Sequence, residues 1–136
     1  MAVRLAVAAD IPRIVDMVCA LRNAIGGPVV PEPDKVTETV MILMGSPSGI
    51  VLVSDGGFIA GSVASTIIST ERFAHELGWF ATDNSGLRLL RAFEAWADSR
   101  GARVRLSTGP EGQVPARLRK ALQRRGYRPY ETAWVK

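Results

Sequence analysis

Apolar residues recur at helical spacing in four stretches of the chain. The first follows Asp10 and Pro12, which are typical of a helix start, and ends at the helix-stopping Gly26-Gly27-Pro28. The second ends at Gly45, and the other two span 86–100 and 114–125. Their inward positions are Ile14, Met17, Val18, Leu21 and Ile25; Val36, Val40, Leu43 and Met44; Leu89, Leu90, Phe93, Trp96 and Ala97; and Val114, Leu118, Ala121 and Leu122. We therefore expect four helices, each with one buried face.

Short apolar or alternating runs predict strands at 3–7, 50–53, 58–69, 73–81, 104–107 and 130–135. Asp55-Gly56-Gly57 predicts a tight hairpin, because glycine tolerates the positive φ of such turns. The order is β, α, α, β, β, β, α, β, α, β, with antiparallel hairpins in the middle and a strand–helix–strand crossover near the end. This order predicts a mixed α/β (α+β) fold: one strongly twisted mixed sheet with helices on both faces. Phe93 and Trp96 are expected to be buried on the sheet.

The composition is ordinary for a globular protein. The chain has 136 residues, which suits a single domain over 1–136, and it is 47% hydrophobic and 22% charged. These values argue against disorder. Cys19 is the only cysteine, so an intrachain disulfide cannot form. No apolar run has transmembrane length and no signal-peptide pattern opens the chain, so we expect a cytoplasmic protein with no membrane partner.

The net charge of +4 is concentrated in the fourth predicted helix and just after it. The basic residues there are Arg117, Arg119, Lys120, Arg124, Arg125 and Arg128. Such a cluster can bind the phosphates of a nucleic acid or of a nucleotide cofactor, or it can be a solvated helix face. No base-reading motif accompanies the cluster, so a nucleic acid is an unfavoured partner.

Several local strings follow one another in a characteristic order. They are Val3-Arg4-Leu5-Ala6 with Ala9-Asp10-Ile11-Pro12; Asp55-Gly56-Gly57-Phe58-Ile59-Ala60-Gly61; Glu76-Leu77-Gly78-Trp79-Phe80; Leu89-Leu90-Arg91-Ala92-Phe93-Glu94-Ala95-Trp96-Ala97; and Gly126-Tyr127. In order and spacing they resemble the GNAT superfamily of N-acetyltransferases over nearly the whole chain. The resemblance implies the acyl-CoA N-acyltransferase fold. Small chains resembling this one occur in phages and prophages.

The resemblance also implies a reaction and a cofactor site. An amine would attack the thioester of acetyl-CoA directly, and the amine would belong to a small molecule or a protein. Backbone groups of Phe80, Ala81 and Thr82 would bind the pantetheine amides, and the amides of Ser85, Gly86, Leu87 and Arg88 would bind the pyrophosphate. Arg117 and Lys120 could meet the 3′-phosphate or an acidic partner. The acceptor side would be built from the first two helices and residues 22–33.

For catalysis the resemblance favours Glu76 as the base, acting through a water, although a salt-bridged strand residue is an equal interpretation. His75, the only histidine, must face the opposite way because neighbours on a strand alternate. Leu122 stands where members of the family often have a tyrosine that protonates the leaving thiolate. Tyr127 and Tyr130 are therefore the replacement candidates for the acid, and packing is the alternative role for each.

The segment 81–86 departs from the family signature Gln/Arg-x-x-Gly-x-Gly/Ala. Ala81 replaces the Gln or Arg, Asn84 replaces the first glycine, and Asp83 places a negative charge near the expected phosphates. Asparagine tolerates the left-handed conformation, so the turn can survive with weaker acetyl-CoA binding. Alternatively the loop is shorter, and the cofactor sits differently or not at all. A catalytically silent binding or accessory protein is therefore the alternative function, and homodimer formation through exposed strand edges stays open.

Overall fold

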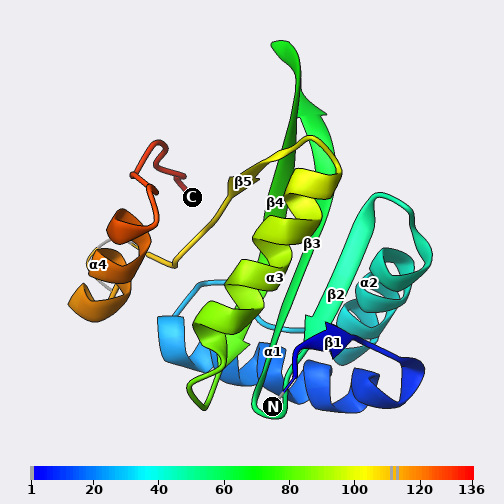
Figure 1. Cartoon of the computed structure of the whole chain (residues 1–136). Helices are drawn as coiled ribbons and strands as arrows, with labels where there is room; N and C mark the ends of the chain where they lie inside the picture. Colours follow the sequence, from blue (N-terminus) through cyan, green and yellow to red (C-terminus); the bar gives the residue numbers. More distant parts are fainter. Residues whose placement is uncertain (1, 111, 113) are drawn as a thin grey trace.

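The computed structural model describes residues 2–110, 112 and 114–136 (Figure 1). Its elements are β1 (Arg4–Leu5), the 3-10 turn η1 (Ala8–Asp10), α1 (Ile11–Ile25), α2 (Pro33–Gly45), β2 (Gly49–Val53), β3 (Gly57–Thr66), β4 (Ser69–Ala81), α3 (Gly86–Ser99), β5 (Arg103–Arg105) and α4 (Ala116–Arg124). All four predicted helices and the first five predicted strands are present, with ends shifted by a few residues.

The strands form one sheet in the order β1-β2-β3-β4-β5. The first four pair antiparallel, whereas β5 pairs parallel to β4 after the chain crosses over through α3. Parallel neighbours need such a crossover, because a short turn can join only antiparallel strands. The predicted mixed α/β sheet is confirmed.

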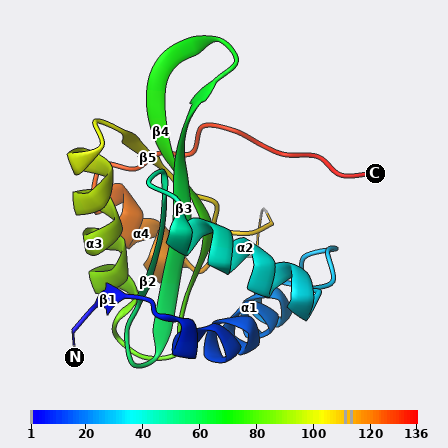
Figure 2. The ribbon, with the colours of Figure 1, turned by 90° about the vertical axis from the view of Figure 1, so that its right-hand side faces the viewer.

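Helices cover both faces of the sheet (Figure 2). Ile50 and Leu52 of β2 belong to a core cluster with α3, while Val51 and Val53 belong to a second cluster with α1 and α2. This split follows from the alternation of side chains along a strand. Phe93 is fully buried, as predicted, but Trp96 is only partly buried at the edge of its cluster. The expectation of a buried Trp96 was therefore only partly right.

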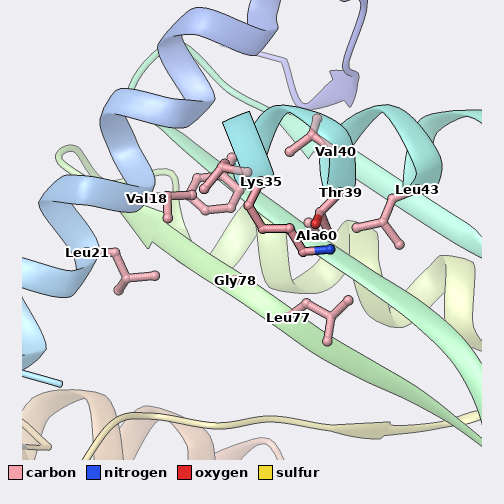
Figure 3. A pocket seen from close by; sticks show the side chains of 11 residues that line it. Val18, Leu21, Lys35, Thr39, Val40, Leu43, Ala60, Leu77 and Gly78 are labelled. Carbon is pink, nitrogen blue, oxygen red and sulfur yellow. The ribbon is translucent and has the colours of Figure 1, made fainter. Parts of the chain in front are cut away.

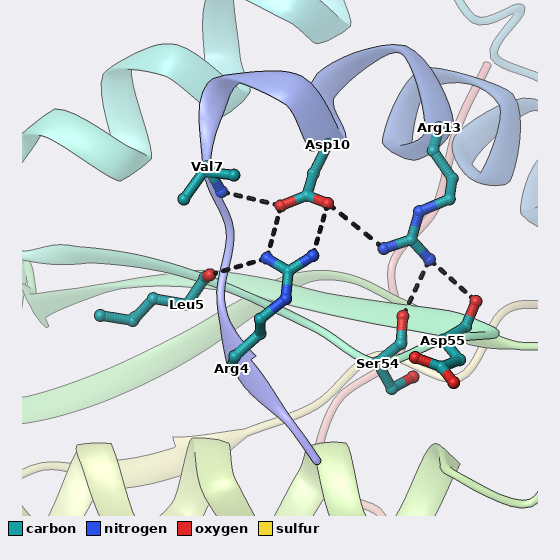
Figure 4. A network of polar contacts seen from close by, with 7 residues as sticks. All are labelled: Arg4, Leu5, Val7, Asp10, Arg13, Ser54 and Asp55. Carbon is teal, nitrogen blue, oxygen red and sulfur yellow. Dashed lines mark hydrogen bonds and ion pairs between the residues drawn. The ribbon is translucent and has the colours of Figure 1, made fainter. Parts of the chain in front are cut away.

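A polar network fixes the start of α1 against the sheet (Figure 4). The buried Asp10 carboxylate accepts hydrogen bonds from Arg4 at 2.7 and 2.9 Å and from the Val7 N–H at 2.8 Å. The Arg4 guanidinium holds the pKa of Asp10 well below its usual range. Arg13 donates to the carbonyl oxygen of Ser54 at 2.8 Å and to that of the next residue. Arg13 also pairs with Asp10 at 3.5 Å, so Asp10 anchors the chain start directly and the β2–β3 turn through Arg13, and its side chain does not cap α1.

The pairing of β3 with β4 contains one irregularity. Ala60 lies opposite Gly78, but the next residue of β3, Gly61, lies opposite Glu76. Leu77 is thus an extra residue on β4, as in a β-bulge. The bulge lies close to the point where β4 leaves β5, and it positions Glu76 at that point.

The predicted last strand at 130–135 is absent. The chain after α4 leaves the sheet (Figure 2), with Tyr130 70% and Trp134 93% exposed. The segment has the alternation of a strand, but β5 is only three residues long and offers few ladder bonds to a partner. One ion pair, between Glu131 and Arg105, holds the start of the segment at β5.

Candidate functional site

β4 and β5 form a fork. Among the described residues they pair only at 73–75 with 103–105, and Glu76 is the first residue of β4 beyond that pairing. Its Oε1 accepts a hydrogen bond of 2.9 Å from the N–H of Ser107, which follows β5. The Glu76 side chain therefore bridges the two strands where they separate.

The surroundings of Glu76 favour its protonated form. Burial raises the pKa of Glu76 to about 7, and the hydrogen bond from Ser107 only partly opposes this effect. A carboxyl group with a pKa near neutrality can both accept and return a proton at physiological pH. This is the property expected of a general base.

His75 lies on the other face of β4, as alternation predicts. It is opposite Ser62 of β3, whereas Glu76 is opposite Gly61. The His75 Nδ1 is 3.5 Å from Nη1 of Arg105. The histidine therefore lies among β4–β5 side chains on the face opposite Glu76.

The outer edge of β4 runs along the open side of the fork. Thr82 donates its N–H to the carbonyl of Gly56 at 2.8 Å, which makes these two residues a hydrogen-bonded antiparallel pair. Because such pairs alternate along a ladder, Phe80 also bonds toward β3, and the main-chain groups of Trp79 and Ala81 point to the outer edge. Of the three residues expected to bind pantetheine amides, Ala81 has its backbone groups at the fork. The N–H of Thr82 is already used in the fold.

Asp83 lies two residues before Ser85, the N-cap residue of α3. Its Oδ1 accepts the N–H of Ser85 at 2.9 Å and also the Ser85 hydroxyl. The Ser85 hydroxyl lies 2.7 Å from that of Ser54, and both residues are buried. The hydrogen bonds from Ser85 lower the pKa of Asp83. The predicted phosphate-binding N–H of Ser85 is thus occupied by a carboxylate of the chain itself.

The other three predicted phosphate-binding amides lie in the first turn of α3. A backbone bond runs from the N–H of Leu89 to the carbonyl of Ser85 at 2.9 Å, so the N–H groups of Gly86 and Leu87, which precede it, have no acceptor within the helix. The carbonyl of Gly86 accepts the indole N–H of Trp79 at 3.0 Å. Trp79 therefore ties the end of β4 to the start of α3, a contact that sequence reasoning missed.

Tyr127 joins α4 to α3. Its hydroxyl donates to Oε2 of Glu94 at 2.7 Å, and Arg125 pairs with the other oxygen. Burial and Glu94 together raise the pKa of Tyr127 above its usual range. The other acid candidate, Tyr130, is exposed, with its ring 5.9 Å from the Arg105 guanidinium. The proton of Tyr127 is thus engaged in a contact between helices.

An apolar hollow of about 180 Å³, open to solvent, lies between α1, α2 and the sheet (Figure 3). Its lining is Val18, Leu21, Lys35, Val36, Thr39, Val40, Leu43, Phe58, Ala60, Leu77 and Gly78. Leu77 and Gly78 follow Glu76 directly, so the hollow reaches the bulge of β4. The first two helices were expected to build the acceptor side; the bulge that completes this wall has no signal in the sequence.

The basic residues of α4 lie at its surface. Arg117 and Lys120 are exposed. Over residues 2–110, 112 and 114–136 no group of three His, Cys, Asp or Glu side chains could hold a metal ion. In the same residues no helix is long and apolar enough to cross a membrane.

The comparisons with known proteins rest on structure. No protein-family model matches the chain, and no curated protein matches it. The structure superimposes on a protein from Arthrobacter sp. FB24 named as an acetyltransferase, with a TM-score of 0.72 and 20% identity, covering 100% of this chain and 90% of the other. The structure also superimposes on a GNAT family acetyltransferase from Staphylococcus aureus, with a TM-score of 0.64 and 14% identity. This match covers 99% of this chain and 96% of the other. The fold is that of the GNAT acetyltransferases.

A further structural neighbour was solved with acetyl-CoA. This protein, from Clostridium acetobutylicum and named as an acetyltransferase, has a TM-score of 0.73 and 14% identity, covering 99% of this chain and 94% of the other. The described chain therefore carries nearly the complete GNAT fold. At these identities the likeness establishes the fold.

Proposed function

We propose that this protein is an N-acyltransferase that transfers an acetyl group from acetyl-CoA to an amine. The observation that carries the proposal is Glu76 at the β4–β5 fork of a GNAT fold, with a pKa raised to about 7. A cytoplasmic location fits this proposal, because Cys19 is the only cysteine and disulfide-free chains are typical of reducing compartments.

In the proposed reaction the acceptor amine first loses a proton. A lysine-like amine has a pKa of roughly 10.4, so at neutral pH it is mostly protonated and needs a base. Glu76, directly or through a water, takes this proton. The nitrogen then attacks the thioester carbonyl carbon, the C–N bond forms, and the C–S bond breaks with departure of the CoA thiolate. Trp79 and Ala81 offer main-chain groups at the fork for the pantetheine arm.

The thiolate must finally gain a proton. Tyr127 remains the candidate acid from the sequence, but its bond to Glu94 and its raised pKa weigh against this role. A thiol has a pKa of about 8.5, so a thiolate leaving group can also take its proton from water near neutral pH. The proposed site therefore works with Glu76 as its one dedicated proton-transfer group.

The hollow between α1, α2 and the sheet is the proposed acceptor site. Its wall is apolar apart from Lys35 and Thr39, so it suits an amine carried on an apolar group. Glu76 pairs with Gly61, and a Cβ on Gly61 would meet Phe93 of α3, so Glu76 is on the other face of the sheet from the hollow. In this proposal the acceptor amine reaches Glu76 through the β4–β5 fork. A screen of amines with acetyl-CoA, read by release of free thiol, tests the activity. Thiol release that depends on one class of amine supports the proposal, and no release with any amine contradicts it.

A silent binding or accessory role is the second candidate. Asp83 favours it, because this carboxylate lies beside the helix end where the cofactor phosphates would bind. Calorimetry separates the two functions. Acetyl-CoA binding supports the enzyme, and no binding at millimolar ligand supports the silent role.

A further inference from the structure

A carboxylate already lies beside the N-terminus of α3. Backbone N–H groups at such a helix end favour negative charge, which is why they often bind phosphate. Here the charge belongs to Asp83, whose Oδ1 accepts both the N–H and the hydroxyl of Ser85. The positive charge of Arg88 further lowers the pKa of Asp83, so the carboxylate stays ionised.

The surrounding structure holds Asp83 in this position. A Cβ on Gly56 would lie 2.5 Å from its Oδ2, so the carboxylate packs directly on the backbone of the β2–β3 turn. The Ser85 hydroxyl is also bound to Ser54 at the end of β2. Rotation of Asp83 away would leave the N–H of the buried Ser85 without the Asp83 acceptor, which is costly.

We propose that Asp83 sets the donor specificity of the enzyme. The carboxylate lies beside the place of the donor's diphosphate at α3 and disfavours it, so the donor is held by its pantetheine arm along β4. The chain then accepts a neutral acyl-pantetheine thioester about as well as acetyl-CoA. This inference rests on the proposed function and names the donor class for the same site.

The physical reason is repulsion between like charges. A diphosphate placed at the N–H groups of Gly86, Leu87 and Arg88 would lie close to the Asp83 carboxylate. The helix end has a partial positive charge of roughly half an elementary charge, and one carboxylate already offsets it. The diphosphate therefore gains little, while contacts made by the uncharged pantetheine arm are unaffected.

The test compares two donors on three proteins. Calorimetry measures the affinities of acetyl-CoA and of S-acetylpantetheine, which lacks the nucleotide and its phosphates. Asp83→Asn keeps an oxygen for the Ser85 N–H and removes the charge. Asp98→Asn removes the same charge from an exposed position near the other end of α3 and is the matched control. Circular dichroism checks folding, and Asp83→Ser replaces Asp83→Asn if the latter unfolds.

We expect the wild type to bind the two donors with affinities within about threefold of each other. Asp83→Asn should bind acetyl-CoA about tenfold more tightly and S-acetylpantetheine within about twofold of wild type, and Asp98→Asn should change neither. The inference is overturned if the wild type prefers acetyl-CoA by about tenfold or more and Asp83→Asn brings no gain, or if Asp98→Asn brings the same gain. If neither donor binds any of the three proteins, the proposed function itself fails, and the inference fails with it.

Discussion

Glu76 lies where β4 leaves β5, and Asp83 lies where the same strand turns into α3. Each carboxylate accepts a backbone N–H, from Ser107 at 2.9 Å and from Ser85 at 2.9 Å. Burial dominates at Glu76 and raises its pKa to about 7, while the hydrogen bonds of Ser85 dominate at Asp83 and lower its pKa. The two acids on this segment thus have opposite properties: Glu76 exchanges protons near neutrality, whereas Asp83 is ionised at neutral pH.

The largest expected effect concerns the rate. Glu76→Gln keeps the shape of the side chain and removes the base, so kcat should fall by about 10²- to 10⁴-fold while acetyl-CoA affinity stays nearly unchanged. Steady-state kinetics with an amine from the screen measure this effect. His75→Gln, on the opposite face of β4, is the control and should do much less. A larger loss in the histidine variant would show that the other face of β4 is the working one.

The second effect concerns stability against pH. Because the pKa of Glu76 rises from 4.5 unfolded to about 7 folded, the folded state holds more protons in this window. Stability should therefore fall as pH rises from 4.5 to 7, by about 1 to 3 kcal/mol. Urea unfolding of wild type and Glu76→Gln at several pH values measures the difference, which should vanish in the variant. Asp83 has a lowered pKa, so its contribution has the opposite sign and is lost in acid.

The third expected effect is a loss of stability when the hydrogen bonds between Asp83 and Ser85 are weakened. Ser85→Ala removes the hydroxyl that links Asp83 to the buried Ser54, and should destabilise the protein by about 1 to 2 kcal/mol. Thermal unfolding measures the loss. Ser99→Ala is a suitable control, because the Ser99 hydroxyl bonds only locally to the carbonyl of Trp96 at the exposed end of α3. Equal losses in both variants would contradict a special role for the Asp83 network.

The smallest expected effect separates Tyr127 from catalysis. Tyr127→Phe removes one hydrogen bond to Glu94 and should cost about 1 kcal/mol of stability. Since this hydroxyl is engaged between helices, kcat should change less than about twofold. Unfolding and kinetics on the same preparation measure both quantities. A tenfold loss of kcat with unchanged stability would make Tyr127 the acid after all.

Much of the fold could be predicted because its signals are local. Helical spacing gave the buried faces of α1 and α3, and Asp55-Gly56-Gly57 gave the β2–β3 hairpin. Alternation alone placed His75 and Glu76 on opposite faces. These features depend on residues close in sequence, so a single chain is enough to infer them.

The rest depends on contacts between distant segments. The sequence placed the charge of Asp83 near the start of α3, but the contacts that hold it there involve Gly56 and, through Ser85, Ser54, which lie at the β2–β3 turn. The missing last strand has the right alternation and fails for lack of a long partner in β5. Nothing in the string Glu76-Leu77-Gly78 shows that its middle residue is left out of the ladder.

At the extra residue Leu77, the alternation of inward and outward side chains along β4 shifts by one position. Ala74, before Leu77, and Trp79, after it, share the α3 side of the sheet although their numbers differ in parity. Any alignment of this strand with a relative must therefore keep a one-residue offset at Leu77. If an alignment places this offset a few positions away from Leu77, the residues between the two positions are assigned to the wrong face of the sheet. Neighbours such as His75 and Glu76 would then exchange roles. Natural insertions and deletions in β4 are for the same reason expected to occur in pairs, or at Leu77 itself.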